Sequence, residues 1–461
     1  MTDVLRRVAA VFSLAALAAC SVGRPPSNAE ADMPPQWYAP LPHNGTLADL
    51  SRWWAQFDDP LLVELIDAAQ AGSTSVAQAR SRLEQARAAR TAARSALFPE
   101  VDAQASAQRG NSQIGIPLAT LLQGGLQASW EVDLFGRNRG TADAASARLR
   151  GAQAGWHEAR VSVAAETANS YVNLRTCQRQ LAVAENDARS RAETARLSQL
   201  SAEAGFTAPA NAALARASAA EGSARATQQR AQCEIEVKGL VALSGLAEPA
   251  LRQKLAAPWR EPANFAMAAV PDVPARLLAQ RPDVFRAEQE VAAASAEVGS
   301  ARADRYPRLT LTGNVGHLQV RAGGATTDLD TWSIGPLAVS LPIFDAGRRA
   351  ANVDSATARY EEAVALLRGT ARQAVREVEE ALVNLDSARS RSADAQAAAE
   401  GYRQSFAATE ARYRAGLASL VELEDQRRQA LAAETALVTL QRERVAAWIA
   451  LYRAVGGGWT R

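Results

Sequence analysis

The triplet Val172-Asn173-Leu174 occurs again as Val383-Asn384-Leu385, and this repetition organises the whole 461-residue chain. The offset is 211 residues (383 minus 172), and Gly205 returns as Gly416 at the same offset. Self-similarity of this kind indicates two copies of one structural unit. Each copy has the order helix, strand pair, very long helix, glycine turn and returning helix.

Two stretches with few helix-breaking residues predict very long helices. In residues 138–205 almost nothing interrupts a helix except a few glycines such as Gly151 and Gly155, and the stretch would span about 100 Å if helical throughout. In the second copy, apolar residues from Val353 to Leu385 recur at a mean spacing close to the coiled-coil value. We expect each long helix to turn back at a tip, near residues 205–210 and 416–419.

Period-two alternation predicts a β-hairpin in each copy, at about residues 101–135 and 308–345. Alternation over about ten residues is typical of transmembrane strands, although two half-buried soluble hairpins would show it as well. In the fourth strand the alternation assigns the apolar face to the odd-numbered residues from Ser333 to Ile343. Stretches rich in small and polar residues predict loops over 110–125 and 316–330.

Four strands are too few to close a barrel, and open strand edges cannot face hydrocarbon. Three chains would supply twelve strands, which lies within the even-numbered range of such barrels. The expected fold is therefore mostly α with a membrane β-barrel, in which long α-helical hairpins accompany four strands per chain. Three chains would complete a 12-strand trimeric barrel.

The N-terminus predicts a lipoprotein signal peptide over residues 1–19. Arg6 and Arg7 precede an apolar run that ends in Leu17-Ala18-Ala19-Cys20, which resembles a bacterial lipobox. In such signals the cysteine becomes the lipidated (palmitate-bearing) N-terminus, and Ser21 in place of aspartate favours the outer membrane. The proline-rich residues 20–50 are expected to form a linker. A plain signal peptide cut nearby is the alternative.

Cys177 and Cys233 lie equally far from Gly205, 28 residues before it and 28 after it. If the chain turns back at Gly205, the two cysteines stand at similar heights on neighbouring helices. A disulfide is then expected in an oxidising compartment. Two buried thiols are the alternative.

Several short motifs together resemble TolC-like outer-membrane efflux proteins, and the lipobox favours the lipoprotein branch that serves RND-type efflux systems (NodT/OprM-like). They are Trp53-Trp54 with Phe57, Asp59-Pro60-Leu61, Arg281-Pro282-Asp283-Val284 and Val455-Gly456-Gly457-Gly458-Trp459. On this reading residues 51–248 are the first repeat, 249–282 a connecting segment and 283–461 the second repeat.

The resemblance implies a homotrimer with its barrel in the outer membrane of a Gram-negative bacterium and an α-helical tunnel in the periplasm. Such a protein is a passive duct for drugs or other small molecules, as in multidrug resistance, and not an enzyme. A periplasmic adaptor (membrane fusion) protein would join it to an inner-membrane RND-type pump that supplies the energy. No cofactor is implied.

The resemblance also implies roles for the two tips. Adaptor contact is expected at Gly205, Phe206, Thr207, Gly416, Leu417 and Ala418. The gate is expected at Tyr413, Val421, Glu422, Asp425 and Asn211. Three-fold symmetry would turn each carboxylate into a ring that narrows the pore and binds cations, whereas a charged helix face with Arg427 and Arg428 is the alternative.

Two departures from the family pattern concern the closed state. Asn211 stands where the family often has an acid that ties down the gate tyrosine, and Ala418 replaces a common arginine. The closed-state latch is therefore expected to be weaker, or to be held by Arg412 or Arg414.

Other functional classes find little support in the sequence. His43, His157 and His317 are far apart and lack ligand spacing with cysteines, so no metal site is expected. The net charge is +2, which offers no basic surface for nucleic acid. Two rival readings stay open, namely an outer-membrane duct for type I protein secretion and a periplasmic coiled-coil structural lipoprotein.

Overall fold

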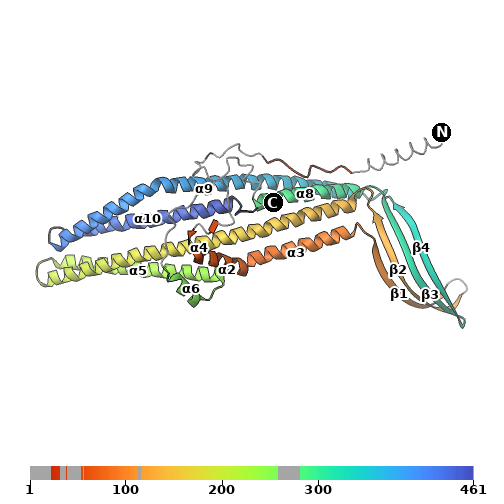
Figure 1. Cartoon of the computed structure of the whole chain (residues 1–461), viewed down its shortest axis with the longest axis horizontal. Coiled ribbons are helices and arrows are strands. Elements are labelled where there is room, and N and C mark those ends of the chain that lie inside the picture. The colour runs from red at the N-terminus through yellow and green to blue at the C-terminus, as the bar shows by residue number, and fades with distance from the viewer. Residues whose placement is uncertain are drawn as a thin grey trace. The chain divides into compact units, whose positions relative to one another are not determined.

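The computed structural model describes residues 22–31, 38, 53–54, 57–112, 116–257 and 281–459. The signal peptide, Cys20 and most of the 20–50 linker and the 249–282 connecting segment lie outside these residues. The helices are α2 (Pro60–Gly72), α3 (Thr74–Ser95), α4 (Arg137–Glu203), α5 (Pro209–Ser244), α6 (Glu248–Leu255), α8 (Pro282–Ala303), α9 (Arg348–Arg414) and α10 (Leu420–Ala454) (Figure 1). The strands are β1 (Glu100–Ser112), β2 (Ile116–Val132), β3 (Arg308–Ala322) and β4 (Ala325–Ser340).

The chain divides into two compact units. One unit contains residues up to Asp32, Arg80–Gly155 and Asp283–Thr370, and so includes the whole sheet. The other contains Met33–Ala79, Trp156–Pro282 and Ala371–Arg461, and so includes both helical tips. The long helices α4 and α9 contribute to both units.

The prediction of two very long helices with returning partners is confirmed. Helices α4 and α9 have 67 residues each, and α5 and α10 return from them with 36 and 35 residues. Helix α2 begins as its sequence predicts, because Pro60 occupies the first turn and the Asp59 side chain accepts from Leu61 N. Among the described helices, none combines the length and apolar character needed to cross a lipid bilayer.

All four strands form one antiparallel sheet in the order β1-β2-β3-β4 (Figure 1). The predicted loops over 110–125 and 316–330 are wrong in extent, because the strands continue through most of both stretches. β2 pairs with β1 from Ile116 onward, and β3 and β4 are separated only by Gly323 and Gly324.

The predicted apolar face of the fourth strand is also wrong in the part of β4 that lies toward its turn with β3. Leu311 pairs with Leu337, whereas Gly313 pairs with Ile334, so β4 has one residue more than β3 between these pairs. This β-bulge shifts the alternation by one residue. Trp332 and Ile334 therefore share a face with Leu337 and Val339, and the apolar face is continuous.

The motifs that carry the family resemblance build the core of the second unit. Trp53 and Trp54 pack against Tyr452, with ring centroids 5.5 and 4.6 Å apart. Both tryptophans, Phe57 and Tyr452 belong to one buried cluster. These residues join the segment before α2 to the end of α10, so the motifs near both ends of the sequence have a packing role.

Arg281 ties the Arg-Pro-Asp segment to the same core. It is buried, it donates to the carbonyl oxygen of Ala454 at 2.8 Å, and it pairs with Glu377 at 2.9 Å. Nearby, a Cβ on Gly457 would lie 2.5 Å from the Val161 side chain. The Arg281 guanidinium thus caps the end of α10, and the turn that follows requires glycine at position 457.

Cys177 of α4 and Cys233 of α5 are joined by a disulfide, with the two Cα atoms 5.5 Å apart. Both cysteines are buried in the second unit's core cluster. The bond closes a loop that contains the first tip. It therefore restrains the first hairpin between its tip and the core.

Replacing both cysteines by serine is expected to lower the free energy of unfolding by about 2–4 kcal/mol, since the disulfide restricts the unfolded chain. Thermal denaturation with and without a reductant would measure this. Thr176→Ser, a small change at the adjacent buried position, serves as the control. An unfolding midpoint that is the same in reduced and oxidised protein would contradict the expectation.

Candidate functional site

The first helical tip is a glycine turn between α4 and α5. Gly205 has φ +78°, a conformation that glycine adopts without strain. Phe206 N donates to Ser201 O at 2.8 Å, which satisfies one of the last carbonyls of α4. Asn211 Nδ2 donates to Thr207 Oγ1 at 3.1 Å, across the start of α5.

The second tip repeats this geometry. Gly416 has φ +74°, and Leu417 N donates to Arg412 O at 2.8 Å. Ser419 caps α10, because its hydroxyl accepts from Glu422 N at 3.1 Å. The 211-residue repeat therefore preserves the turn that closes each hairpin.

Both tips present a large apolar side chain to solvent. Phe206 is 86% exposed and Leu417 is 70% exposed. A single exposed apolar residue needs no explanation, but these two occupy equivalent positions after the turn glycines. The pair makes the tips suited to contact with another protein.

The two hairpins pack together just behind their tips. Leu420 and Leu423 of α10 are buried with Ala195 of α4 and Ala215 of α5. Tyr413 packs against this cluster, and its hydroxyl lies 2.8 Å from Ser198 Oγ of α4. Within one chain, the partner of Tyr413 is Ser198 and not Asn211.

The reason for this difference is the helix that each residue occupies. Asn211 is in the first turn of α5 and bonds within its own tip, whereas Tyr413 faces α4. The family pattern pointed to the position of Asn211 on α5, so it could not have found Ser198, which lies on α4.

The predicted gate acids are paired with arginines of their own hairpin. Glu422 forms an ion pair with Arg412 at 2.9 Å. Arg412 is one of the two arginines that were expected to hold the closed state. Asp425 pairs with Arg428 and accepts from Gln429 Nε2 at 2.9 Å. Both acids are partly exposed, and the neighbouring Val421 is exposed.

A buried ionic network, which sequence reasoning missed, links the two hairpins one turn further from the tips. Glu424 of α10 pairs with Arg191 of α4 at 2.8 Å and accepts from Ser218 Oγ of α5 at 2.9 Å. Arg191 in turn pairs with Asp187 at 2.9 Å, and both side chains are 6% exposed. One carboxylate thus holds three helices.

Arg427 completes this network. It pairs with Glu424, donates to Thr194 Oγ1 at 2.9 Å and lies over the Phe406 ring at 5.4 Å. Burial lowers the pKa of Arg427 below its ordinary value, although Glu424 and Asp187 oppose the shift. The signal was present in the sequence as Glu424 beside Arg427, but only the packing shows that this face is buried.

One face of the sheet carries a continuous apolar band. Leu126, Val315 and Trp332 stand in one cross-strand row, and Trp130, Leu311 and Leu337 form another row nearer the helices. At the helix end of the sheet, each strand is flanked by one aromatic residue: Phe98, Phe135, Tyr306 and Phe344. An apolar band with aromatic residues at its border is typical of a lipid-facing surface.

An extended segment, residues 22–31, lies along the helices of the first unit. Arg302 donates to Gly23 O at 2.7 Å, Ser295 to Pro25 O at 2.5 Å, and Arg368 to Glu30 O at 3.4 Å. Its first contact, at Arg302, is near the start of β3. Residue 22 therefore lies at the sheet end of α8.

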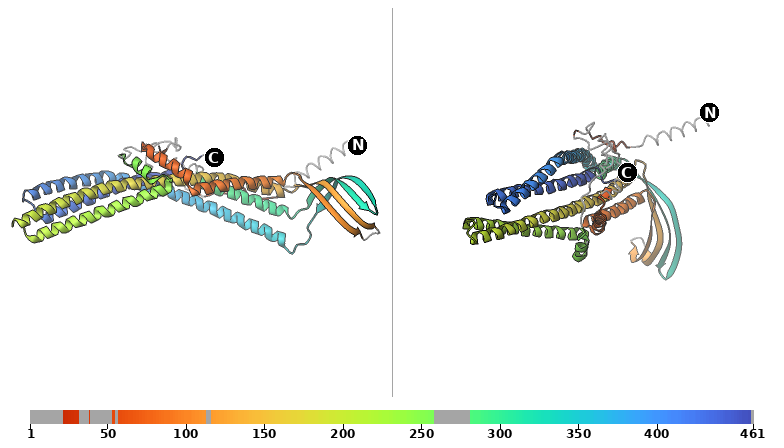
Figure 2. Two further views of the ribbon diagram at one scale, coloured as in Figure 1. Left: turned by 90° about the horizontal axis from the view of Figure 1, so that it is seen from below. Right: turned by 60° about the vertical axis from the view of Figure 1, so that its left-hand side comes forward.

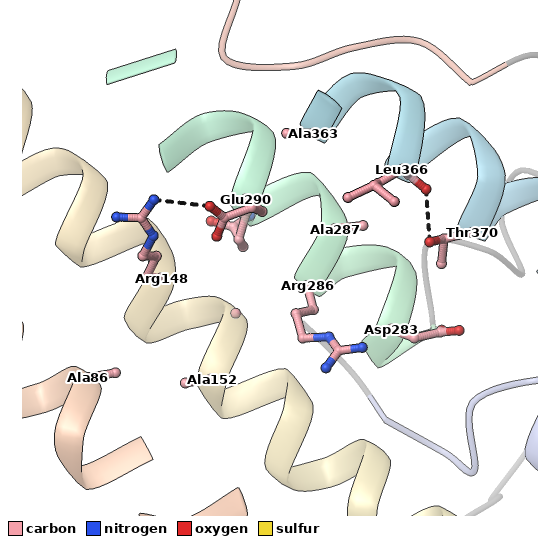
Figure 3. Close-up of a pocket in the computed structure, with 12 residues that line it drawn as sticks. Ala86, Arg148, Ala152, Asp283, Arg286, Ala287, Glu290, Ala363, Leu366 and Thr370 are labelled. Atoms are coloured by element: carbon pink, nitrogen blue, oxygen red, sulfur yellow. Dashed lines mark hydrogen bonds and ion pairs between the residues drawn. The ribbon is translucent and has the colours of Figure 1, made fainter. Parts of the chain in front are cut away.

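The first unit also contains a cavity of about 520 Å³ between α3, α4, α8 and α9 (Figure 3). Ala86, Ala152, Ala287 and Ala363 line it, and Arg148 at its edge pairs with Glu290 at 3.0 Å. Asp283, Arg286 and Gln289 are among the other lining residues. Among the described residues, no group of His, Cys, Asp and Glu could hold a metal ion.

The chain belongs to the outer membrane efflux protein family, whose model matches residues 65–246 and 273–457. Each matched stretch is one of the two repeats, so the mostly helical, duplicated fold is that of an outer-membrane efflux channel. The family consists of ducts.

Three relatives show how complete the similarity is. The chain is 29% identical to the solvent efflux pump outer membrane protein SrpC of Pseudomonas putida, over 98% of each chain. It is 28% identical to nodulation protein T of Rhizobium leguminosarum bv. trifolii, over 97% of this chain and 96% of that one. The open state of the Neisseria gonorrhoeae MtrE outer membrane channel matches 95% of this chain and 98% of its own, with 25% identity and a TM-score of 0.81.

The buried network predicts unequal effects for two neighbouring acids. Glu424→Ala is expected to lower the free energy of unfolding by about 3–5 kcal/mol, because it removes the ion-pair partner of the buried Arg427. Asp425→Ala, the matched control in a partly exposed pair, is expected to cost less than about 1 kcal/mol. Denaturation of the purified protein measures both, and equal losses would contradict the burial argument.

Proposed function

We propose that this chain is the outer-membrane duct of a tripartite RND-type efflux system, through which drugs or other small molecules leave the cell. The observation that carries the proposal is the match of both repeats to one efflux-channel family. The relatives' names, a solvent efflux pump protein among them, support a small-molecule substrate. The chain would act as a passive conduit without catalysis.

The working form would be a homotrimer. The sheet has two edge strands, β1 and β4, and pairing β4 of one copy with β1 of the next would close twelve strands into a barrel. The apolar band would face the lipid of a Gram-negative outer membrane. The helical hairpins would form the periplasmic tunnel.

The two tips would dock the periplasmic adaptor and carry the gate. Phe206 and Leu417, exposed beside Gly205 and Gly416, supply apolar anchors of the kind that binding sites use. The remaining contacts proposed there are Thr207 and Ala418. The gate would consist of Tyr413, Val421, Glu422 and Asp425, with Asn211 at the neighbouring tip.

Lipidation at Cys20 is part of the proposal, with cleavage after residue 19. Gly23 is held beside Arg302 at the sheet end of α8, and three residues of chain can span at most about 11 Å. An acyl chain on Cys20 would thus start close to the helix end of the sheet, where the band begins. This agrees with insertion into the periplasmic leaflet of the outer membrane.

Removing the acids is expected to widen the gate. The double variant Glu422→Ala/Asp425→Ala should raise the single-channel conductance of the purified trimer in planar bilayers, because each chain loses two charges and the Arg412 pair. Glu221→Ala, which alters an exposed ion pair on α5, is the control. Unchanged conductance would remove these acids from the gate, and a non-conducting monomer would refute the duct itself.

Lipidation is tested separately by Cys20→Ser. This variant is expected to lose all incorporation of radiolabelled palmitate in cells, whereas Cys177→Ser should keep it. The protein should nevertheless remain in the membrane fraction, since the barrel and not the acyl chain would be the main membrane element. Palmitate incorporation into Cys20→Ser would rule out this cysteine as the acceptor.

A further inference from the structure

In β3 and β4 the two faces of the sheet exchange polarity at one level along the strands. On the face with the apolar band, the row of Val315 and Trp332 is followed, toward the turns, by His317 and Asp330, whose Nδ1 and Oδ1 lie 2.8 Å apart. In the next row on that face, Gln319 donates to Asp328 at 2.8 Å. The band therefore ends sharply.

The opposite face changes in the reverse sense. Near the helices it is polar: Asp102, Gln127, Asn314 and Ser333 share one row. Toward the turns it gains a cluster of apolar side chains in two cross-strand pairs, Leu318 with Leu329 and Leu121 with Val320, while Gln123 and Thr327 are polar neighbours in the same rows. The outermost row, Ala119, Ala322 and Ala325, is also without polar side chains.

Glycines occupy the level at which the faces exchange. Gly125 pairs with Gly316, and a Cβ on Gly125 would lie 2.6 Å from Val315 O. A Cβ on Gly316 would lie 2.9 Å from Gly124 O. The neighbouring backbones close in on the side where these Cβ atoms would point, so that side, which is polar near the helices, is concave here. The curvature of the strands is visible in Figures 1 and 2.

The strands are also longer than a bilayer requires. β2 has 17 residues and β4 has 16, whereas about 9–11 tilted residues cross the hydrocarbon. If the apolar band faces lipid, the turn ends project beyond the membrane, and water is available to both faces there. In one chain Leu121 is 37% exposed and Leu329 is 48% exposed. On a face turned toward a water-filled lumen, these apolar side chains would stabilise the protein only if another surface covered them.

We propose that Leu121, Leu318, Val320 and Leu329 of three copies meet across the barrel axis as an apolar constriction at the extracellular mouth. The covering surface is the same cluster of the other two copies, because barrel closure through β1 and β4 turns this face of every copy toward one axis. The close backbone approach at Gly125 and Gly316 allows the projecting ends of the strands to bend toward the barrel axis. Apolar constrictions of this kind resist the passage of water and ions. The proposal rests on the proposed function, since it requires the trimeric barrel.

Conductance of the full-length trimer tests the constriction. The tip gate lies in series with it, so the variants are made in the Glu422→Ala/Asp425→Ala background. Leu318→Ser with Leu329→Ser is expected to raise single-channel conductance at least about twofold by letting water into the mouth. The control is Leu122→Ser, the same change on the opposite face of β2. A conducting trimer in which the mouth variant matches the control overturns the constriction, whereas absence of conduction in every variant overturns the proposed duct and the constriction with it.

Crosslinking tests the approach of the three copies directly. Leu329→Cys is expected to form interchain disulfides on mild oxidation, seen as dimers in a non-reducing gel. Thr331→Cys, on the same face but one row nearer the helices, and Asp330→Cys, on the opposite face, are expected to remain uncrosslinked. No crosslinking at residue 329, or equal crosslinking at all three positions, overturns the constriction.

Discussion

The unpaired edges of β1 and β4 are the constraint on which the rest of the structure depends. A backbone N–H or C=O group that faces hydrocarbon without a partner costs several kcal/mol, so a four-stranded sheet with an apolar face cannot enter a membrane alone. In the proposed trimer, three copies would resolve the constraint by pairing edge to edge. The duplication within each chain then supplies two helical hairpins for every four strands, and hence six hairpins for one barrel.

The helical part meets a different constraint, because its core is thin and rich in alanine. Charged side chains therefore take part in packing between the hairpins, where Arg191, Glu424 and Arg427 are held together by opposite charge and by hydroxyl groups of α4 and α5. Buried charges of this kind specify one arrangement, since removing a partner is far more costly than the net strength of the pair. The partly exposed pairs at Glu422 and Asp425 lack this cost, which would suit them to separate if they form the proposed gate.

Much of the fold could be predicted from local patterns. The 67-residue helices followed from the scarcity of breakers, and the position of the Cys177–Cys233 disulfide followed from the symmetry of the hairpin about Gly205. The turn ends of β3 and β4 could not be predicted, because their two faces exchange polarity beyond Val315 and period-two alternation loses its phase there. The bulge opposite Leu311 had the same effect on β4. At the tips, the family pattern identified Tyr413, but its partner Ser198 depends on how α9 packs on α4.

The sequence by itself determined the repeat, the helix lengths, the glycine turns and the presence of four amphipathic strands, since each of these depends on residues close together in the chain. The tertiary structure alone decided which side chains of α10 are buried, which hydroxyl meets Tyr413, and at what level the faces of the sheet exchange. Those features depend on residues up to more than 200 positions apart, such as Ser198 and Tyr413, and no local pattern records such a contact. The internal duplication can therefore be recognised in the sequence, whereas the different packing of its two copies is visible only in the tertiary structure.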